Sequence, residues 1–273
     1  MTRRAIEAGD AAANPRPLGF RGGGFVARPR PLAAWAALIG AILLWQAAST
    51  VGLVSPVFLP SPDSVARALW RLALSGKLAD HLEASLVRIL GGWVIGTLAG
   101  LAAGTAIGVF SLARAAGLPI VSALFPIPKI ALLPLFILWF GIGEPAKLAT
   151  IALGVFFPTV IATASGIDQV PRSLIRMAQS FNLPGHAILR TIVLPGALPG
   201  ILSGFRISAS IALILVVAAE MIGAERGIGA FILTAGNLMQ TDQLLAGVVV
   251  LSLLGLGVGA LLSAAERWLL RWR

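Results

Sequence analysis

Residues 86–110 read LVRILGGWVIGTLAGLAAGTAIGVF, and this stretch decides the class of fold. It is long enough to cross a hydrocarbon core, which takes about 20 predominantly apolar residues. Glycine recurs at every fourth position, at Gly92, Gly96, Gly100, Gly104 and Gly108. Without Cβ atoms, two helix backbones can approach closely, which is how helices associate in lipid. We expect this glycine face to pack within one subunit, with a seam between subunits as the alternative.

The composition extends this interpretation to the whole chain. Of the 273 residues, 58% are hydrophobic and 12% are charged, and the mean hydropathy is +0.92. A soluble domain carries roughly 25% charged residues, because its surface faces water. We therefore expect an all-α membrane protein, a polytopic bundle of about six transmembrane helices. The expected spans cover about 32–53, 86–110, 118–140, 146–164, 199–222 and 244–264. Between the first two, residues 63–70 predict an amphipathic surface helix, capped by Ser61 or Asp63.

The net charge of +10 is distributed as in a membrane protein. The arginines lie mainly near the N-terminus, in one central loop and at the C-terminus, without the interleaved aromatic residues of a nucleic-acid site. This pattern fits the positive-inside rule. We expect residues 1–31 to be a flexible cytoplasmic tail, residues 32–273 to form the transmembrane domain, and both termini to lie inside. The prediction is a multi-pass membrane protein that contacts the lipid bilayer and no nucleic acid.

Covalent chemistry has no candidate residues in this sequence. There is no cysteine, and hence no thiolate nucleophile or cysteine-type zinc site. His81 and His186 fall in predicted loops on opposite sides of the membrane, so they cannot share a metal ion or a triad. No G-x-x-x-x-G-K-[ST] loop is present to bind ATP phosphates. We expect no catalytic residue, metal or cofactor in this chain.

The central loop is the most informative segment for function. Residues 176–200 read RMAQSFNLPGHAILRTIVLPGALPG. We expect a short helix over 173–181, ended by Asn182 in the left-handed conformation. A second helix is expected to begin at Pro184 and to end at the pairs Leu194-Pro195 and Leu198-Pro199. An apolar face projecting into the cytoplasm implies a partner protein; the alternative is a hairpin folded back on the chain's own spans.

This loop resembles the EAA loop, the conserved cytoplasmic loop of permease subunits in ATP-binding-cassette (ABC) importers. That motif reads E-A-A, three residues, G, and about nine residues to an I-x-L-P ending. Aligned on residues 192–195, the chain has Arg176-Met177-Ala178 and Asn182 at the E-A-A and G positions, so the leading Glu and the Gly are replaced. Further strings are similar to the nitrate, sulfonate and taurine branch, in the same order: residues 58–62, 81–88, 130–135, 139–144 and 219–223.

The resemblance implies a type I ABC importer fold, a location in a bacterial inner membrane, and a set of partners. A second permease copy, two ATPase subunits that bind ATP and Mg, and an extracytoplasmic substrate-binding protein would complete the transporter. The solute would be a small anion such as nitrate, a sulfonate or taurine. The alternatives are an ion-gradient-driven secondary transporter and a non-transporting membrane assembly protein.

By the same resemblance, the loop of about 166–198 holds the coupling helix that seats in a groove of the ATPase. The coupling residues would be Arg176, Met177, Ala178, Gln179, Ser180, Phe181, Asn182, Leu183, Pro184 and Gly185. Among them we expect Ala178, Phe181 and Leu183 to form the apolar docking face, with Arg176 at its polar edge.

The translocation path should lie beside the pieces least compatible with lipid. The third span contains four prolines and Lys129, and freed carbonyls or an ammonium at that depth must line a cavity or be covered by protein. We place the path there and along the fifth span, at Lys129, Ser208, Ser210 and Glu220. Lys129 would meet an anionic substrate, or else pair with a carboxylate or snorkel to an interface. Glu220 is expected to have a structural role.

Overall fold

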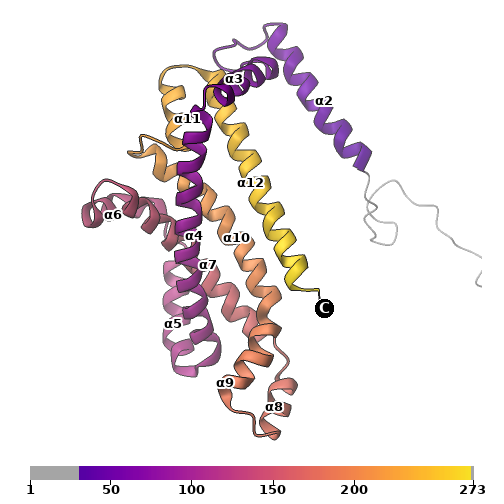
Figure 1. Ribbon diagram of the computed structural model, residues 1–273, viewed down its shortest axis with the longest axis vertical. Helices are drawn as coiled ribbons and strands as arrows, with labels where there is room; N and C mark the ends of the chain where they lie inside the picture. Colours follow the sequence, from indigo (N-terminus) through magenta and orange to yellow (C-terminus); the bar gives the residue numbers. More distant parts are fainter. Residues whose placement is uncertain (1–30, 272–273) are drawn as a thin grey trace, which may run out of the picture.

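The computed structural model describes residues 31–271 (Figure 1). The spanning and surface helices are α2 (Pro31–Thr50), α3 (Pro62–Leu74), α4 (Lys77–Val109), α5 (Ser111–Leu124), α6 (Leu133–Phe140), α7 (Glu144–Asp168), α8 (Arg172–Ser180), α9 (Gly185–Ile188), α10 (Leu194–Met221), α11 (Ile228–Asn237) and α12 (Thr241–Leu269). A 3-10 turn, η1 (Lys129–Leu132), precedes α6, and a π-helical turn, η2 (Leu189–Val193), precedes α10. Five helical segments can cross a membrane, or six if the bent α5–α6 pair is one span, which confirms the predicted all-α bundle. The expected tail over residues 1–31 lies outside the described residues, apart from Pro31.

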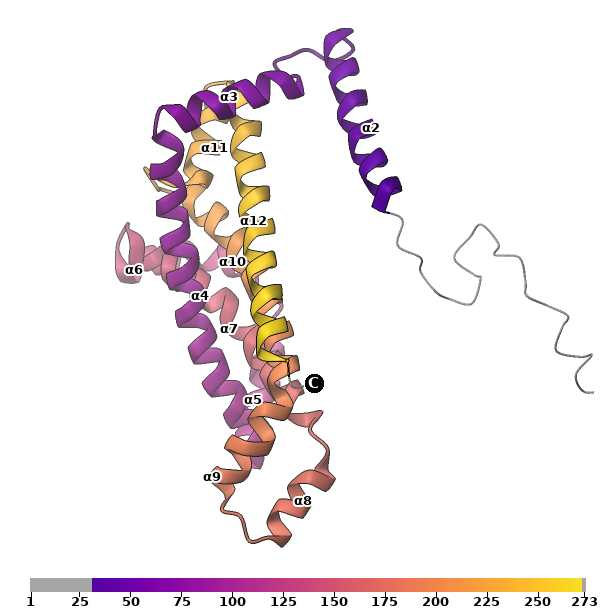
Figure 2. The same ribbon diagram turned by 45° about the vertical axis from the view of Figure 1, so that its right-hand side comes forward.

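The glycine face of α4 packs inside the chain, against α7. A Cβ atom on Gly92 would lie 2.6 Å from the Ile151 Cβ, and one on Gly104 would lie 2.6 Å from the Thr163 Cβ, closer than real Cβ atoms come. Gly96, Gly100 and Gly108 meet the next turns of α7 in the same way. The α4–α7 pair, with α10 crossing it, forms the centre of the bundle (Figures 1 and 2).

The third predicted span, expected over 118–140, is broken at its prolines. α5 ends at Leu124, and the axis bends by 90° before η1 and α6. Pro126 and Pro128 lie in the break and supply no N–H to continue the ladder. α6 therefore points away from the bundle at the level of α4 and α7 (Figures 1 and 2).

The fifth span begins earlier than predicted, because the helix does not stop at Leu194-Pro195 or Leu198-Pro199. α9, η2 and α10 form one continuous apolar helix from Gly185 to Met221. The π turn is wider than an α-helical turn and shifts the hydrogen-bond register directly before Pro195. As a result, Pro195 lies in the first turn of α10. The prediction that these pairs end the helix is wrong.

α3 lies across one end of the bundle and carries α2 on its outer side (Figure 2). The Ser61 Oγ accepts a hydrogen bond from the Ser64 N–H, which confirms the predicted cap of the amphipathic helix. α2 contacts the rest of the described chain mainly near α3, where the Trp45 indole donates to the Pro60 carbonyl at 3.0 Å.

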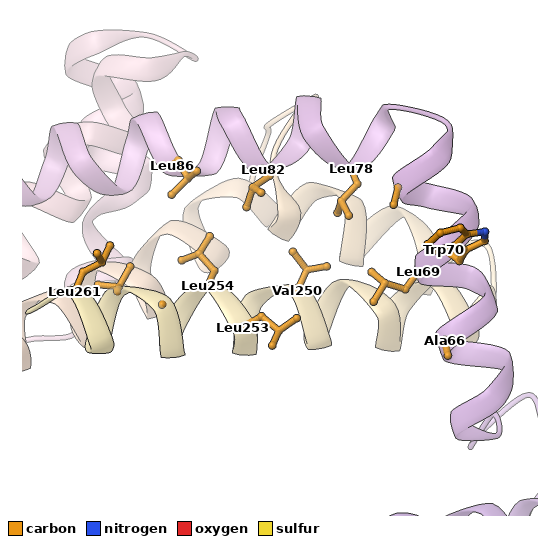
Figure 3. Close-up of a pocket in the computed structure, with 13 residues that line it drawn as sticks. Ala66, Leu69, Trp70, Leu78, Leu82, Leu86, Val250, Leu253, Leu254 and Leu261 are labelled. Atoms are coloured by element: carbon orange, nitrogen blue, oxygen red, sulfur yellow. The ribbon is translucent and has the colours of Figure 1, made fainter. Parts of the chain in front are cut away.

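A groove of about 660 Å³ runs between α3, α4 and α12 (Figure 3). Leucines of α4 and α12 face each other across it, among them Leu82 and Leu254. The Trp70 indole is the one polar group in its lining. Because such a lining offers an anion almost no hydrogen-bond donors, the groove is not a candidate translocation path.

Candidate functional site

The segment 172–188, named the tip segment here, holds α8 and α9 at the end of the molecule opposite α3 (Figures 1 and 2). Asn182 has φ 55°, the left-handed conformation predicted for it. The Leu183 N–H donates to the Ala178 carbonyl at 3.2 Å and closes α8. Pro184 precedes α9 as its N-cap residue, as predicted. The tip segment is therefore a helix, a tight turn and a second helix.

The two faces of α8 have different surroundings. Ala178 is 1% exposed and packs in a cluster with Ile188 and Val193 of the same chain. Phe181 is 74% exposed, and Met177 and Leu183 are exposed beside it. Ala178 cannot reach a partner from this position. The prediction that it forms part of the docking face is therefore corrected. It anchors α8 on the spans, while Phe181 projects away from them.

The other expected coupling residues lie at the surface of the tip segment. Arg176, Gln179, Ser180, Pro184 and Gly185 are all exposed. The loop thus combines both interpretations of the sequence: its inner stripe folds back on the chain's own spans, and its outer stripe remains uncovered.

An ion-pair network lies at the other end of the bundle, where α4, α7 and α10 meet; Arg88 and Glu220 are buried and Glu144 reaches the surface. The Arg88 Nε and Nη2 donate to the two carboxylate oxygens of Glu144 at 2.7 and 2.6 Å. Its Nη1 donates to the Glu220 Oε1 at 2.8 Å and to the Arg226 carbonyl at 2.6 Å. Bidentate pairs of this kind are the strongest side-chain hydrogen bonds. A single guanidinium therefore connects three helices and the loop before α11.

The Glu220 side chain is wholly buried and is held by hydrogen bonds inside the bundle. Its carboxylate accepts hydrogen bonds from the Ser85 hydroxyl at 2.8 Å and from the Gly229 N–H at 2.9 Å. The Ile228 N–H in turn donates to the Ser85 Oγ at 2.9 Å. The carboxylate thus lies at the positive N-terminus of α11, which favours an anion. Both oxygens of the Glu220 carboxylate therefore accept hydrogen bonds inside the protein.

The sequence contained this network in separate pieces. Ser85 and Arg88, Glu144, and Glu220 each stood in a different string similar to the importer family. The available signal was a charged residue in each of three strings, although the first string also holds Glu83, which takes no part in the network. Nothing in the spacing indicated that the three charges meet.

The two histidines lie in helices rather than in the predicted loops. His81 is in the first turns of α4 and His186 opens α9, at opposite ends of the molecule (Figure 1). The His81 Nδ1 accepts a hydrogen bond from the Gly227 N–H at 3.1 Å and so supports the same loop as Glu220.

The four residues expected along the path lie in separate surroundings. Lys129 is buried and donates to the carbonyls of Leu124 and Phe125. Ser208 is buried and accepts a hydrogen bond from the Trp93 indole at 3.0 Å. Ser210 is exposed on α10, and Glu220 belongs to the network above. No hydrogen bond between any two of these four is present in the described part of the chain.

Comparison with known proteins assigns the family. The model for the binding-protein-dependent transport system inner membrane component matches residues 96–272. The chain belongs to this family of ABC importer permeases. The permease is 37% identical over 236 residues to the taurine transport system permease protein TauC of Escherichia coli, across 85% of its length and 86% of the relative. It is 38% identical over 244 residues to SsuC of Escherichia coli and 36% over 232 residues to SsuC of Bacillus subtilis, both named for aliphatic sulfonates.

The fold is also found among solved structures. A chain of the MetNI methionine ABC transporter, in an inward-facing conformation, superposes with a TM-score of 0.59 at 21% sequence identity. The match covers 77% of the permease and 98% of that chain, and it confirms the type I importer fold. The permease is a non-catalytic, multi-pass subunit of the inner membrane. Permeases of this family work with an ATPase and a substrate-binding protein. This excludes the two alternatives, an ion-gradient-driven secondary transporter and a non-transporting assembly protein.

Proposed function

We propose that the permease imports a small sulfonate such as taurine. The names of its relatives support this class of solute. In this proposal two permease copies assemble with two ATPase subunits, which bind ATP and Mg, and both termini and the tip segment face the cytoplasm. The arginines of the tip segment and of the C-terminus support that orientation.

The tip segment is the coupling element in this proposal. The observation that carries it is the exposed Phe181, held away from the spans by the buried Ala178. Exposed aromatic side chains that enter a partner's pocket supply much of the binding energy of an interface. Phe181, Met177 and Leu183 would seat in the ATPase groove, with Arg176 at the rim. Closure of the ATPases would then move α8 and, through the cluster around Ala178, the ends of the spans.

In this proposal the path lies between α10 and the broken α5–α6 pair. The break brings irregular backbone into the middle of the bundle, and such backbone occurs at membrane depth only where it is covered by protein or lines a cavity. Ser210 lies exposed on α10 and would contribute a hydroxyl to the solute. Ser208 would position Trp93 behind it.

The test compares Phe181→Ala with Leu261→Ala, an equally exposed apolar residue on α12. Both variants are purified with the ATPase, and ATP hydrolysis stimulated by the loaded binding protein is measured. We expect Phe181→Ala to reduce the stimulation at least about tenfold and Leu261→Ala to leave it unchanged. Equal stimulation in the two variants would contradict the proposed docking role.

A further inference from the structure

The break between α5 and η1 lies near the middle of the membrane-spanning part. The Lys129 Nζ lies 4.4 Å from the centre of the Phe157 ring, and Phe157 is near the middle of α7. α5 itself starts at the level of the other end of α7, where Arg114 pairs with Asp168 at 2.7 Å. The chain therefore runs as α5 to about the middle of the membrane-spanning part. The helix breaks there, and the chain continues as α6 at an angle of 90° (Figure 2).

The break leaves helix carbonyls without their usual donors. In a continuous helix the Leu124 carbonyl would accept from the N–H of residue 128, but Pro128 has none. The Ile127 N–H reaches the Leu124 carbonyl only at 3.3 Å. An unsatisfied carbonyl at this depth is costly, because no water replaces the missing donor.

Lys129 supplies the missing donors. Its ammonium donates to the Leu124 carbonyl at 2.9 Å and to the Phe125 carbonyl at 2.6 Å. The side chain is 8% exposed and has no carboxylate within ion-pair distance among residues 31–271. Its charge lies at the negative C-terminal end of α5 and over the face of Phe157, both of which stabilise a cation.

We propose that Lys129 is a positioning residue that caps α5 inside the membrane and thereby fixes the direction of α6. Two of its three donors are used by backbone carbonyls and the ammonium is covered by Phe157, so the cation does not bind the transported anion. Lys129 thereby positions the outer side of α6, which carries the exposed side chains of Leu138, 78% exposed, and Trp139. This role of Lys129 rests on the proposed transport function only where uptake is measured, and it does not depend on which solute is carried.

The first test separates positioning from substrate binding by transport kinetics. We expect Lys129→Met to lower the maximal rate of ATP-driven uptake about tenfold, the loss typical of a charged hydrogen bond, and to leave KM unchanged. Pro128→Ala restores an N–H for the Leu124 carbonyl, so Lys129→Met/Pro128→Ala should recover part of the rate. A raised KM with an unchanged maximal rate would overturn the proposal, as would a double variant no better than Lys129→Met.

The second test follows α6 directly and needs no transport. The chain has no cysteine, so a single Leu138→Cys reports the environment of α6 by its rate of alkylation with a maleimide. We expect Lys129→Met to change this rate several-fold and Pro128→Ala to move it back. Glu225→Cys, on the exposed loop before α11, should react equally in all backgrounds. An identical Leu138→Cys rate with Lys129 and with Met at that position would overturn the proposal.

Discussion

Arg88 on α4 and Glu220 on α10 form an ion pair that is closed off from solvent. Their Nη1 and Oε1 atoms lie 2.8 Å apart, and the two side chains are 6% and 0% exposed. The remaining donors of Arg88 hold Glu144 at the start of α7. Arg88 therefore joins α4 to both α10 and α7, and Lys147 supplies the second cation beside Glu144.

Removing one partner of this pair should be strongly destabilising. Arg88→Met leaves the Glu220 carboxylate buried without its cation, and we expect the free energy of unfolding to fall by about 3–5 kcal/mol. The measurement is thermal unfolding of the permease in detergent. Arg114→Met is the matched control, because its pair with Asp168 is exposed and screened. Similar losses in both variants would contradict the role given to the buried network.

The glycine face of α4 should tolerate no added methyl group. A Cβ on Gly96 would collide with the Ala152 carbonyl and lie 2.9 Å from the Val155 Cβ. We expect Gly96→Ala to cost about 1–3 kcal/mol, measured by thermal unfolding. Gly257→Ala on α12 is the control, because nothing lies within 4 Å of its added Cβ. If the two variants unfold alike, the close packing of α4 on α7 is wrong.

Ala178→Asp should release the tip segment from the spans rather than remove a docking contact. A carboxylate at this buried position has no partner, so α8 should lift away from Ile188 and Val193. Trypsin should then cleave the loop at Arg172 and Arg176 faster than in the parent protein. Phe181→Asp adds the same charge at an exposed position and should leave the cleavage rate unchanged. Equal cleavage of both variants would show that Ala178 does not anchor α8.

The sequence predicted the features that depend on local pattern. The glycine repeat of α4, the left-handed Asn182 and the cap at Ser61 each follow from residue types at fixed spacing, and each is present. Prolines likewise indicated that the third span is irregular. Its 90° bend was not predictable, because no local pattern shows that α6 turns to contact α7.

The rest could not be read locally, because it depends on contacts between distant residues. Arg88 meets partners 56 and 132 positions away in the chain. Ala178 and Phe181 are both apolar residues of the tip segment, and only the position of Val193 and Ile188 shows that Ala178 faces inward. The depth of Lys129 in the third span marks it as unusual, but its partners do not follow from that depth. They are the Leu124 carbonyl, which Pro128 leaves without its helical donor, and the Phe125 carbonyl.

Uptake by reconstituted vesicles tests the central claim, that this permease imports a small sulfonate with energy from ATP. The permease, its ATPase and its binding protein are incorporated so that ATP reaches the ATPase, and uptake of radiolabelled taurine is followed. We expect uptake only when ATP and all three proteins are present. Uptake by the permease alone, driven by a sodium or proton gradient, would contradict the account.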